Sequence, residues 1–251
     1  MPHFRIGALL SRCKSALPRT VIGSVLLLPA AALAADPPSF QDTIAQRVTA
    51  CTSCHGKDGR AASDGYYPRI AGKTEGYLYN QLANFRDGRR NYRLMNHLVE
   101  HFSDDYMREI AHHFATLDLP YAAPQPTAAN AVTLQRGKAL VTNGDPARKL
   151  PACAACHGAA LTGALPNIPG LLGLPRDYIN AQLGAWQVDQ RRAHAPDCMS
   201  QVARILTTQD IQAVSSWLAA QPVPGNAHPT SASTAPLPLE CGTAPATAKP
   251  P

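Results

Sequence analysis

Residues 51–55 read Cys51-Thr52-Ser53-Cys54-His55, and residues 153–157 read Cys153-Ala154-Ala155-Cys156-His157. Cys-x-x-Cys-His is the attachment signature of c-type haem. Two thiols at this spacing can add to the two vinyl groups of one haem, and the next residue, a histidine, is then held against one face of the iron. The two copies predict two covalently bound haem c groups, with His55 and His157 as the proximal iron ligands.

The sequence that follows each motif is repeated as well. Pro68-Arg-Ile-Ala-Gly72 matches Pro169-Gly-Leu-Leu-Gly173, and Tyr77-Leu-Tyr-Asn-Gln81-Leu82 matches Tyr178-Ile-Asn-Ala-Gln182-Leu183. Arg89-Arg90 then matches Arg191-Arg192, and Met95 matches Met199. Repetition over this length indicates two homologous units in tandem.

Each unit is expected to be helical, so the fold class is all-α. Tyr77, Leu78, Leu82 and Phe85 recur at helical spacing, and no run shows sustained strand-like alternation. Two good N-cap residues, Ser103 and Thr207, precede later apolar segments with helical spacing. The expected organisation is a signal peptide (1–34), a first domain (35–119), a linker (120–131), a second domain (132–221) and a proline-rich tail without secondary structure (222–251).

A haem that only carries electrons is expected to have a second protein ligand on the iron. Met95 and Met199 are the candidates, because they fall at matching places after the two haem motifs. A thioether ligand opposite histidine raises the reduction potential. Alternatively, both methionines could fill the core, and His97 or His101 could replace Met95 as the ligand.

Two matched prolines are expected to support the proximal histidines. A backbone carbonyl at Pro68 or Pro169 can accept the N–H of the second ring nitrogen of His55 or His157, which fixes the orientation of the ring. The alternative is that both prolines only shape a turn.

The first 34 residues have the pattern of a secretory signal. Arg5, Arg12, Lys14 and Arg19 precede an apolar stretch, and Ala32-Leu33-Ala34 fits a cleavage site, so we expect export and cleavage near Ala34. An uncleaved membrane anchor is the alternative reading. The formal net charge is +6, and four positive charges lie in this segment, so the remainder carries only +2. Nothing in this balance favours binding to nucleic acid.

Seven cysteines are present, of which Cys13 lies in the signal and four belong to the haem motifs. The remaining pair, Cys198 and Cys241, is expected to form a disulfide in an oxidising compartment. An intermolecular disulfide or a reactive thiol is the alternative. Because Cys198 directly precedes Met199, we hypothesise that the bond pins the tail across the second haem and stiffens the methionine loop.

Taken together, residues 43 to 220 resemble two tandem class I cytochromes c, and in particular the two-haem cytochromes of the c-four family. The resemblance implies two small helical domains, each wrapped round one haem, in a periplasmic carrier that delivers electrons to a terminal oxidase. The segment from Arg192 to Met199 is longer than its counterpart, and the tail with Cys241 is an addition to the plain two-domain pattern.

The leading functional hypothesis is therefore an electron-transfer protein without substrate chemistry of its own. Its expected partners are redox proteins: a cytochrome bc complex or a dehydrogenase as donor, and a terminal oxidase as acceptor. Peripheral association with the membrane is left open. A cytochrome subunit of a periplasmic flavin- or quinone-dependent dehydrogenase is a close alternative. A two-haem peroxidase and a zinc tetrathiolate site fit less well, because a sixth ligand is available at both haems and a histidine follows each cysteine pair.

Overall fold

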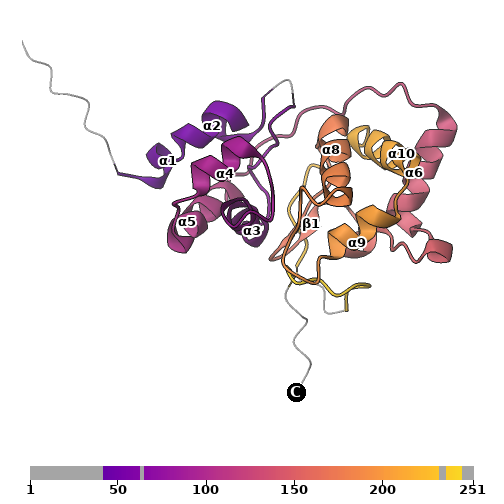
Figure 1. The fold of residues 1–251 in the computed structure, drawn as a ribbon. Coiled ribbons are helices and arrows are strands. Elements are labelled where there is room, and N and C mark those ends of the chain that lie inside the picture. Colours follow the sequence, from indigo (N-terminus) through magenta and orange to yellow (C-terminus); the bar gives the residue numbers. More distant parts are fainter. Residues whose placement is uncertain (1–41, 63–64, 232–235, 245–251) are drawn as a thin grey trace, which may run out of the picture. The chain divides into compact units, whose positions relative to one another are not determined.

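The computed structural model describes residues 42–62, 65–231 and 236–244, and the predicted signal segment lies outside them. The first repeat is helical, as the sequence predicts (Figure 1). Its elements are α1 (Ile44–Arg47), α2 (Thr49–His55), the 3-10 turn η1 (Lys57–Gly59), α3 (Glu75–Arg86), α4 (Arg93–Val99) and α5 (Asp104–Ala115).

The second repeat has five helices that correspond to those of the first, with its 3-10 turn before the haem-motif helix and a short hairpin after it. Its elements are α6 (Ala131–Asn143), the 3-10 turn η2 (Pro146–Arg148), α7 (Cys153–His157), β1 (Gly163–Ala164), β2 (Ile168–Pro169), α8 (Arg176–Gln187), α9 (Cys198–Ile205) and α10 (Thr208–Ala219). No helix in the described ranges is both long enough and apolar enough to cross a bilayer.

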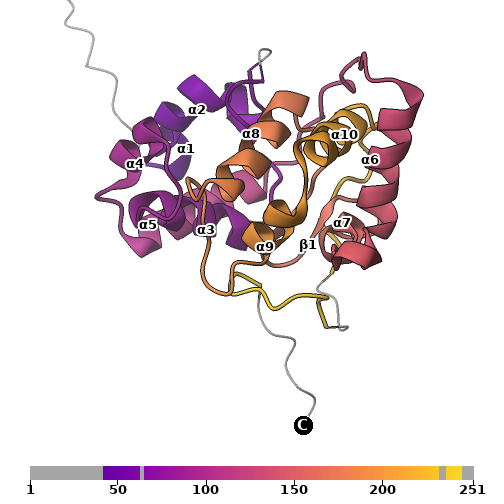
Figure 2. The ribbon, with the colours of Figure 1, turned by 45° about the vertical axis from the view of Figure 1, so that its right-hand side comes forward.

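Each repeat has its own apolar core. In the first repeat, α3 packs on α5, and the core contains Val48, Leu78 and Phe114. In the second repeat, α6 and α10 lie side by side (Figure 2). Gly137 permits this close approach, because a Cβ there would lie 2.1 Å from the carbonyl oxygen of Ala213.

The predicted N-caps mark the starts of the last helix in each repeat. The Ser103 hydroxyl accepts the backbone N–H of Tyr106 at 3.2 Å. The Thr207 hydroxyl accepts the N–H of Asp210 at 3.1 Å, and the Asp210 carboxylate accepts the N–H of Thr207 at 3.2 Å. This reciprocal capping box satisfies two backbone donors that a helix start otherwise leaves unpaired.

A short hairpin in the second repeat was not expected from the sequence. Strands β1 and β2 pair antiparallel with Gly163 opposite Pro169 and Ala164 opposite Ile168. Two residues are too few for an alternating pattern to be visible in a sequence. The tail adds to this hairpin, since the N–H of Thr230 donates to Gly163 O at 3.0 Å and Thr230 O accepts from Leu165 N at 2.9 Å. Otherwise, the described parts of the tail contain no helix or strand, as expected.

Candidate functional site

A single cavity of about 1160 Å³ brings the predicted site residues together. Small-molecule sites usually measure about 300–1,000 Å³, so this cavity exceeds the size that one small ligand needs. It lies within one structural unit, Phe40–Pro251, and both repeats contribute to its lining. The predicted residues that line it are Cys51, Cys54, His55, Pro68, Met95, Cys153, Cys156, His157, Pro169, Met199, Cys198 and Cys241.

Both predicted proximal histidines are oriented by a proline carbonyl. The Nδ1 of His55 lies 2.8 Å from Pro68 O, and the Nδ1 of His157 lies 2.8 Å from Pro169 O. Each carbonyl accepts the Nδ1 hydrogen, which leaves Nε2 with a free lone pair. Burial is the largest cause lowering the pKa of both imidazoles, although each carbonyl bond opposes it. Both rings are therefore held in the neutral form that can bind iron.

The two thiols of each motif face the same cavity, because residues three apart lie on one face of a helix. Burial raises the pKa of the Cys153 thiol to about 11. Burial also raises the pKa of Cys51 and Cys156. None of the four is in a disulfide, so all four thiols are available for thioether formation.

The methionines and the competing histidines are placed differently. Met95 on α4 and Met199 on α9 both line the cavity. The His97 and His101 side chains are 84% and 90% exposed, pair with Glu100, and are absent from the cavity lining. The geometry therefore favours Met95 over either histidine as the second ligand of the first site.

The residues present also fit the carboxylate edge of a haem. Trp186 is buried in the cavity lining, and its indole Nε1–H has no hydrogen-bond partner among the described residues. A buried donor without a partner is costly, and a haem propionate would satisfy it. The matching residue of the first repeat, Phe85, has no such donor.

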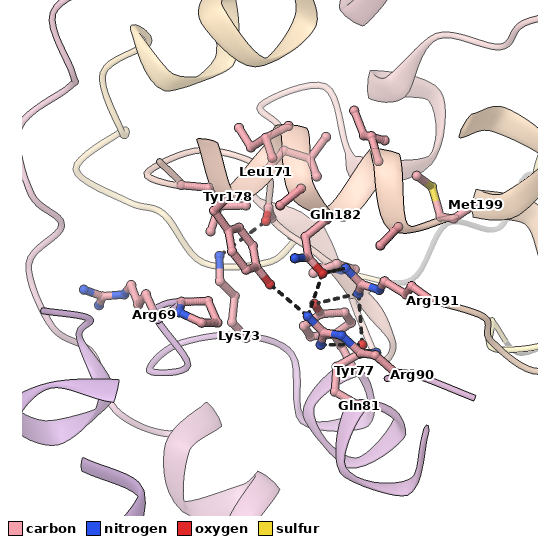
Figure 3. Close-up of a pocket in the computed structure, with 18 of the residues that line it drawn as sticks. Arg69, Lys73, Tyr77, Gln81, Arg90, Leu171, Tyr178, Gln182, Arg191 and Met199 are labelled. Atoms are coloured by element: carbon pink, nitrogen blue, oxygen red, sulfur yellow. Dashed lines mark hydrogen bonds between the residues drawn. The ribbon is translucent and has the colours of Figure 1, made fainter. Parts of the chain in front are cut away.

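A cluster of two arginines, two glutamines and two tyrosines joins the repeats (Figure 3). Arg90 donates to Gln81 Oε1 at 3.0 Å and to Gln182 Oε1 at 2.7 Å. Arg191 donates to the same two oxygens, at 2.9 Å and 2.7 Å. The remaining bonds, each 3.3 Å long, run from Arg90 to the Tyr178 hydroxyl and from Arg191 to the Tyr77 hydroxyl.

This arginine cluster carries uncompensated positive charge. Within the described residues, neither Arg90 nor Arg191 has a carboxylate partner. Arg191 is buried, its guanidinium carbon lies 3.9 Å from the centroid of the Trp186 ring, and burial lowers its pKa. Buried cations of this kind fit anionic groups. The sequence alignment assigned these arginines no role and matched Arg90 with Arg192, one residue too far. In the structure Arg90 is equivalent to Arg191, because the Arg90 N–H donates to Asn84 O and the Arg191 N–H donates to Ala185 O at the matching place after each helix.

The second site has an additional element, the C-terminal tail. Cys198 and Cys241 form a disulfide, as predicted. Gly242 N donates to Pro196 O at 2.9 Å, and Asn167 Nδ2 donates to Thr243 O at 2.6 Å. The tail residues that line the cavity are Leu237, Leu239, Cys241, Thr243 and Ala244.

The cytochrome c family profile matches the chain twice, over residues 43–115 and 134–221. The thiosulfate dehydrogenase electron acceptor of Thiomonas intermedia (strain K12) is 34% identical over 80% of this chain and 88% of its own length. Cytochrome c4 of Pseudomonas aeruginosa is 30% identical over 68% of this chain and 84% of its own length.

Two solved structures share the fold. Reduced recombinant cytochrome c4 from Pseudomonas stutzeri has a TM-score of 0.59 and 26% identity, with coverage of 69% of this chain and 94% of that chain. Thiosulfate dehydrogenase (TsdBA) from Marichromatium purpuratum has a TM-score of 0.61 and 32% identity over 68% of this chain. The match spans only 36% of that longer chain.

The fold and the paired sites define a c-type cytochrome with two haems. The chain belongs to the cytochrome c family, and the match over both repeats confirms two tandem cytochrome c domains. It has two covalently bound haem c groups and acts as an electron carrier, like the relatives it resembles. When bound, the haems supply the one-electron chemistry. The chain's own residues attach them, orient the ligands and set the charge around them.

Proposed function

We propose that this protein is a periplasmic dihaem carrier that accepts electrons from a thiosulfate dehydrogenase and passes them to a terminal oxidase or a similar acceptor. The observation that carries the proposal is the 34% identity to a thiosulfate dehydrogenase electron acceptor over 80% of the chain. A second protein of that name, from Stutzerimonas stutzeri, is also 34% identical. The predicted signal at residues 1–34 supports export, and a cytochrome bc complex is the alternative donor.

We infer the same ligand set at both sites. Cys51 and Cys54, with His55 and Met95, serve the first haem, and Cys153 and Cys156, with His157 and Met199, serve the second. The support is that all these side chains line the cavity and that each proximal imidazole is held by a proline carbonyl. Pro68 and Pro169 act as positioning residues, because each fixes the tautomer that leaves Nε2 free.

A permanent subunit of a dehydrogenase complex is the second candidate. Its support is the similarity to part of a longer chain whose structure is described as a thiosulfate dehydrogenase. In that case the cytochrome would copurify with a catalytic chain. Size-exclusion chromatography of the native periplasmic fraction, followed by haem staining, distinguishes a free carrier from a subunit.

The decisive experiment mixes the ferric holoprotein with a purified thiosulfate dehydrogenase. Thiosulfate alone should leave the haems ferric, and addition of the enzyme should reduce them rapidly, as followed by the visible absorbance of ferrous haem. Another periplasmic dehydrogenase with its own substrate serves as the matched control. Fast reduction by the control enzyme but not by thiosulfate dehydrogenase would contradict the proposed donor.

We also propose that the tail covers the second site and holds Met199 in place. Its support is the disulfide at Cys198, the residue before Met199, together with five tail residues in the cavity lining. In the first repeat, Leu94 occupies the position of Cys198 and is 60% exposed. A partner protein then meets an open first site and a covered second one.

A further inference from the structure

Lys73 is a buried lysine that has no acidic partner in the part of the chain that the structure describes. It belongs to the first repeat, just before α3, and is only 5% exposed. Its ammonium lies 5.9 Å from the centroid of the Tyr121 ring. The neighbouring group, Arg69, is a second cation, and it donates to the backbone carbonyls of Ala71 and Pro120. Among the described residues, no carboxylate forms an ion pair with Lys73 or Arg69.

The Lys73 side chain crosses to the proximal loop of the second site. Lys73 Nζ donates to Gly170 O at 3.3 Å. Gly170 directly follows Pro169, whose carbonyl accepts the Nδ1 hydrogen of His157. Figure 3 shows Lys73 reaching toward the part of the second repeat that carries Leu171. A residue of one repeat thus contacts the loop that orients the iron ligand of the other.

The second repeat has no cation at the position equivalent to Lys73, so no matching charge acts on the first site. The repeat alignment places Leu174 opposite Lys73, directly after the matched glycines Gly72 and Gly173. The first site has Arg90 near His55 instead, and Arg90 belongs to the arginine cluster that contacts both repeats. Lys73 is therefore a charge that distinguishes the second site from the first.

We propose that Lys73 is a positioning residue that raises the reduction potential of the second haem, through its buried charge and its bond to Gly170. The inference rests on the proposed haem site at His157. Oxidation adds one positive charge to the iron, and a nearby cation in a poorly solvated environment opposes that addition. The ammonium also polarises the loop whose carbonyl holds the imidazole. Both effects favour the ferrous state at the second haem.

Charge at Lys73 is maintained at neutral pH despite its burial. Burial, followed by the nearby Arg69, lowers the pKa of Lys73 to about 8. A value of about 8 still leaves the ammonium as the major form at pH 7. The ionisable groups that face it are Arg69, Tyr121 and His157, and the charge of Lys73 contributes to the lowered pKa of His157.

The test is a potentiometric titration of the holoprotein, with the two haems assigned by NMR of the half-reduced state. Lys73→Met keeps the length of the side chain and removes the charge. It should lower the second potential and shift the electron distribution about tenfold toward the first haem, which equals about 59 mV for one electron. Lys73→Arg should keep most of the original distribution. Lys138→Met, which removes an exposed charge on α6, should leave both potentials in place.

Three results would overturn the inference: an unmoved second potential in Lys73→Met, an equal shift at both haems, or the same shift in Lys138→Met. Lys73→Gln provides a second neutral variant if Lys73→Met does not fold. Haem content and the visible spectrum of each variant are measured separately. If the unmodified protein contained only one haem, the proposed site at His157 would be refuted. If Lys73→Met contained two haems with unchanged potentials, only the role of Lys73 would be refuted.

Discussion

Removal of the Cys198–Cys241 disulfide is expected to destabilise the second repeat selectively. The double variant Cys198→Ser/Cys241→Ser avoids a leftover thiol beside Met199. The tail would then be held by its non-covalent contacts, among them the hydrogen bonds from Gly242 N to Pro196 O at 2.9 Å and from Asn167 Nδ2 to Thr243 O at 2.6 Å. Bonds of this kind contribute about 1 kcal/mol each, which is too little to replace a covalent link.

The free energy that the disulfide contributes follows from the length of the loop that it closes. Cys198 and Cys241 are 43 residues apart. Loop-closure entropy for that length gives about 4 kcal/mol at 25 °C, and measured disulfides typically contribute about 2–4 kcal/mol. Because the loop contains α9 and α10, the loss falls on the second repeat. The first repeat lies outside the loop and should keep its free energy of unfolding within about 0.5 kcal/mol.

The assay is urea unfolding of the ferric holoprotein, with the ligation of each haem followed separately by NMR. The matched comparison is the unmodified protein after thiol reduction of the disulfide, alkylation of the two freed thiols and reoxidation of the haems with ferricyanide, because thioether bonds to haem are not thiol-exchangeable. The variant and the reduced protein should show the same decrease in the free energy of unfolding of the second repeat. An increased urea dependence is also expected, since the uncrosslinked unfolded chain exposes more surface.

Two outcomes would refute this reasoning. A loss below about 1 kcal/mol would mean that the folded tail does not depend on the link. An equal loss at both haems would mean that the tail stabilises the whole protein rather than the second site. Faster loss of the Met199–iron bond in the variant, with the bond in the first repeat unchanged, would support the proposed role of the tail.

Three further predictions concern single side chains. Met199→Leu should abolish the methionine–iron charge-transfer absorbance of the second haem and lower its potential, whereas His97→Ala should leave both haem spectra intact. Trp186→Phe copies the residue at Phe85 and should cost the second repeat about 1–2 kcal/mol in urea unfolding through the lost N–H donor; no change would contradict a bound propionate. Because the pKa of Lys73 is lowered from 10.5 to about 8, the unfolded chain binds more protons between these values, so stability should rise with pH across that window. The rise, by up to about 3 kcal/mol, should be absent in Lys73→Met when unfolding is measured at several pH values.

The sequence predicts the haem chemistry well because covalent attachment requires a fixed local spacing. Cys-x-x-Cys-His places three functional groups within five residues, and the repeat then locates Pro68, Met95 and their partners by simple alignment. The same alignment predicts the helix starts at Ser103 and Thr207, since N-capping is a local interaction. The structure shows the two N-cap bonds and the bonds from His55 and His157 to the proline carbonyls.

Contacts between the repeats could not be predicted in the same way. The bonds from Arg90 to Gln182 and from Lys73 to Gly170 join residues 92 and 97 positions apart. Their partners depend on how two helical units pack, and no pattern within either unit encodes that packing. The β1–β2 hairpin also escaped prediction, because two-residue strands are defined by backbone pairing rather than by alternating side chains.

The arrangement of these contacts bears on the direction of electron flow. The hydrogen bonds of the arginine cluster are nearly symmetric, because Arg90 and Arg191 each contact Gln81 and Gln182, but only the charge of Arg90 acts on a predicted iron ligand, His55. Three other asymmetric features act on the second site: the proposed charge of Lys73, the indole N–H at Trp186, and the disulfide-linked tail. If the first two stabilise the ferrous second haem, and the tail keeps partners away from it, an electron delivered at the first haem moves to the second and is retained there. A chain duplicated from one carrier would thereby gain a direction of transfer that two identical sites cannot have.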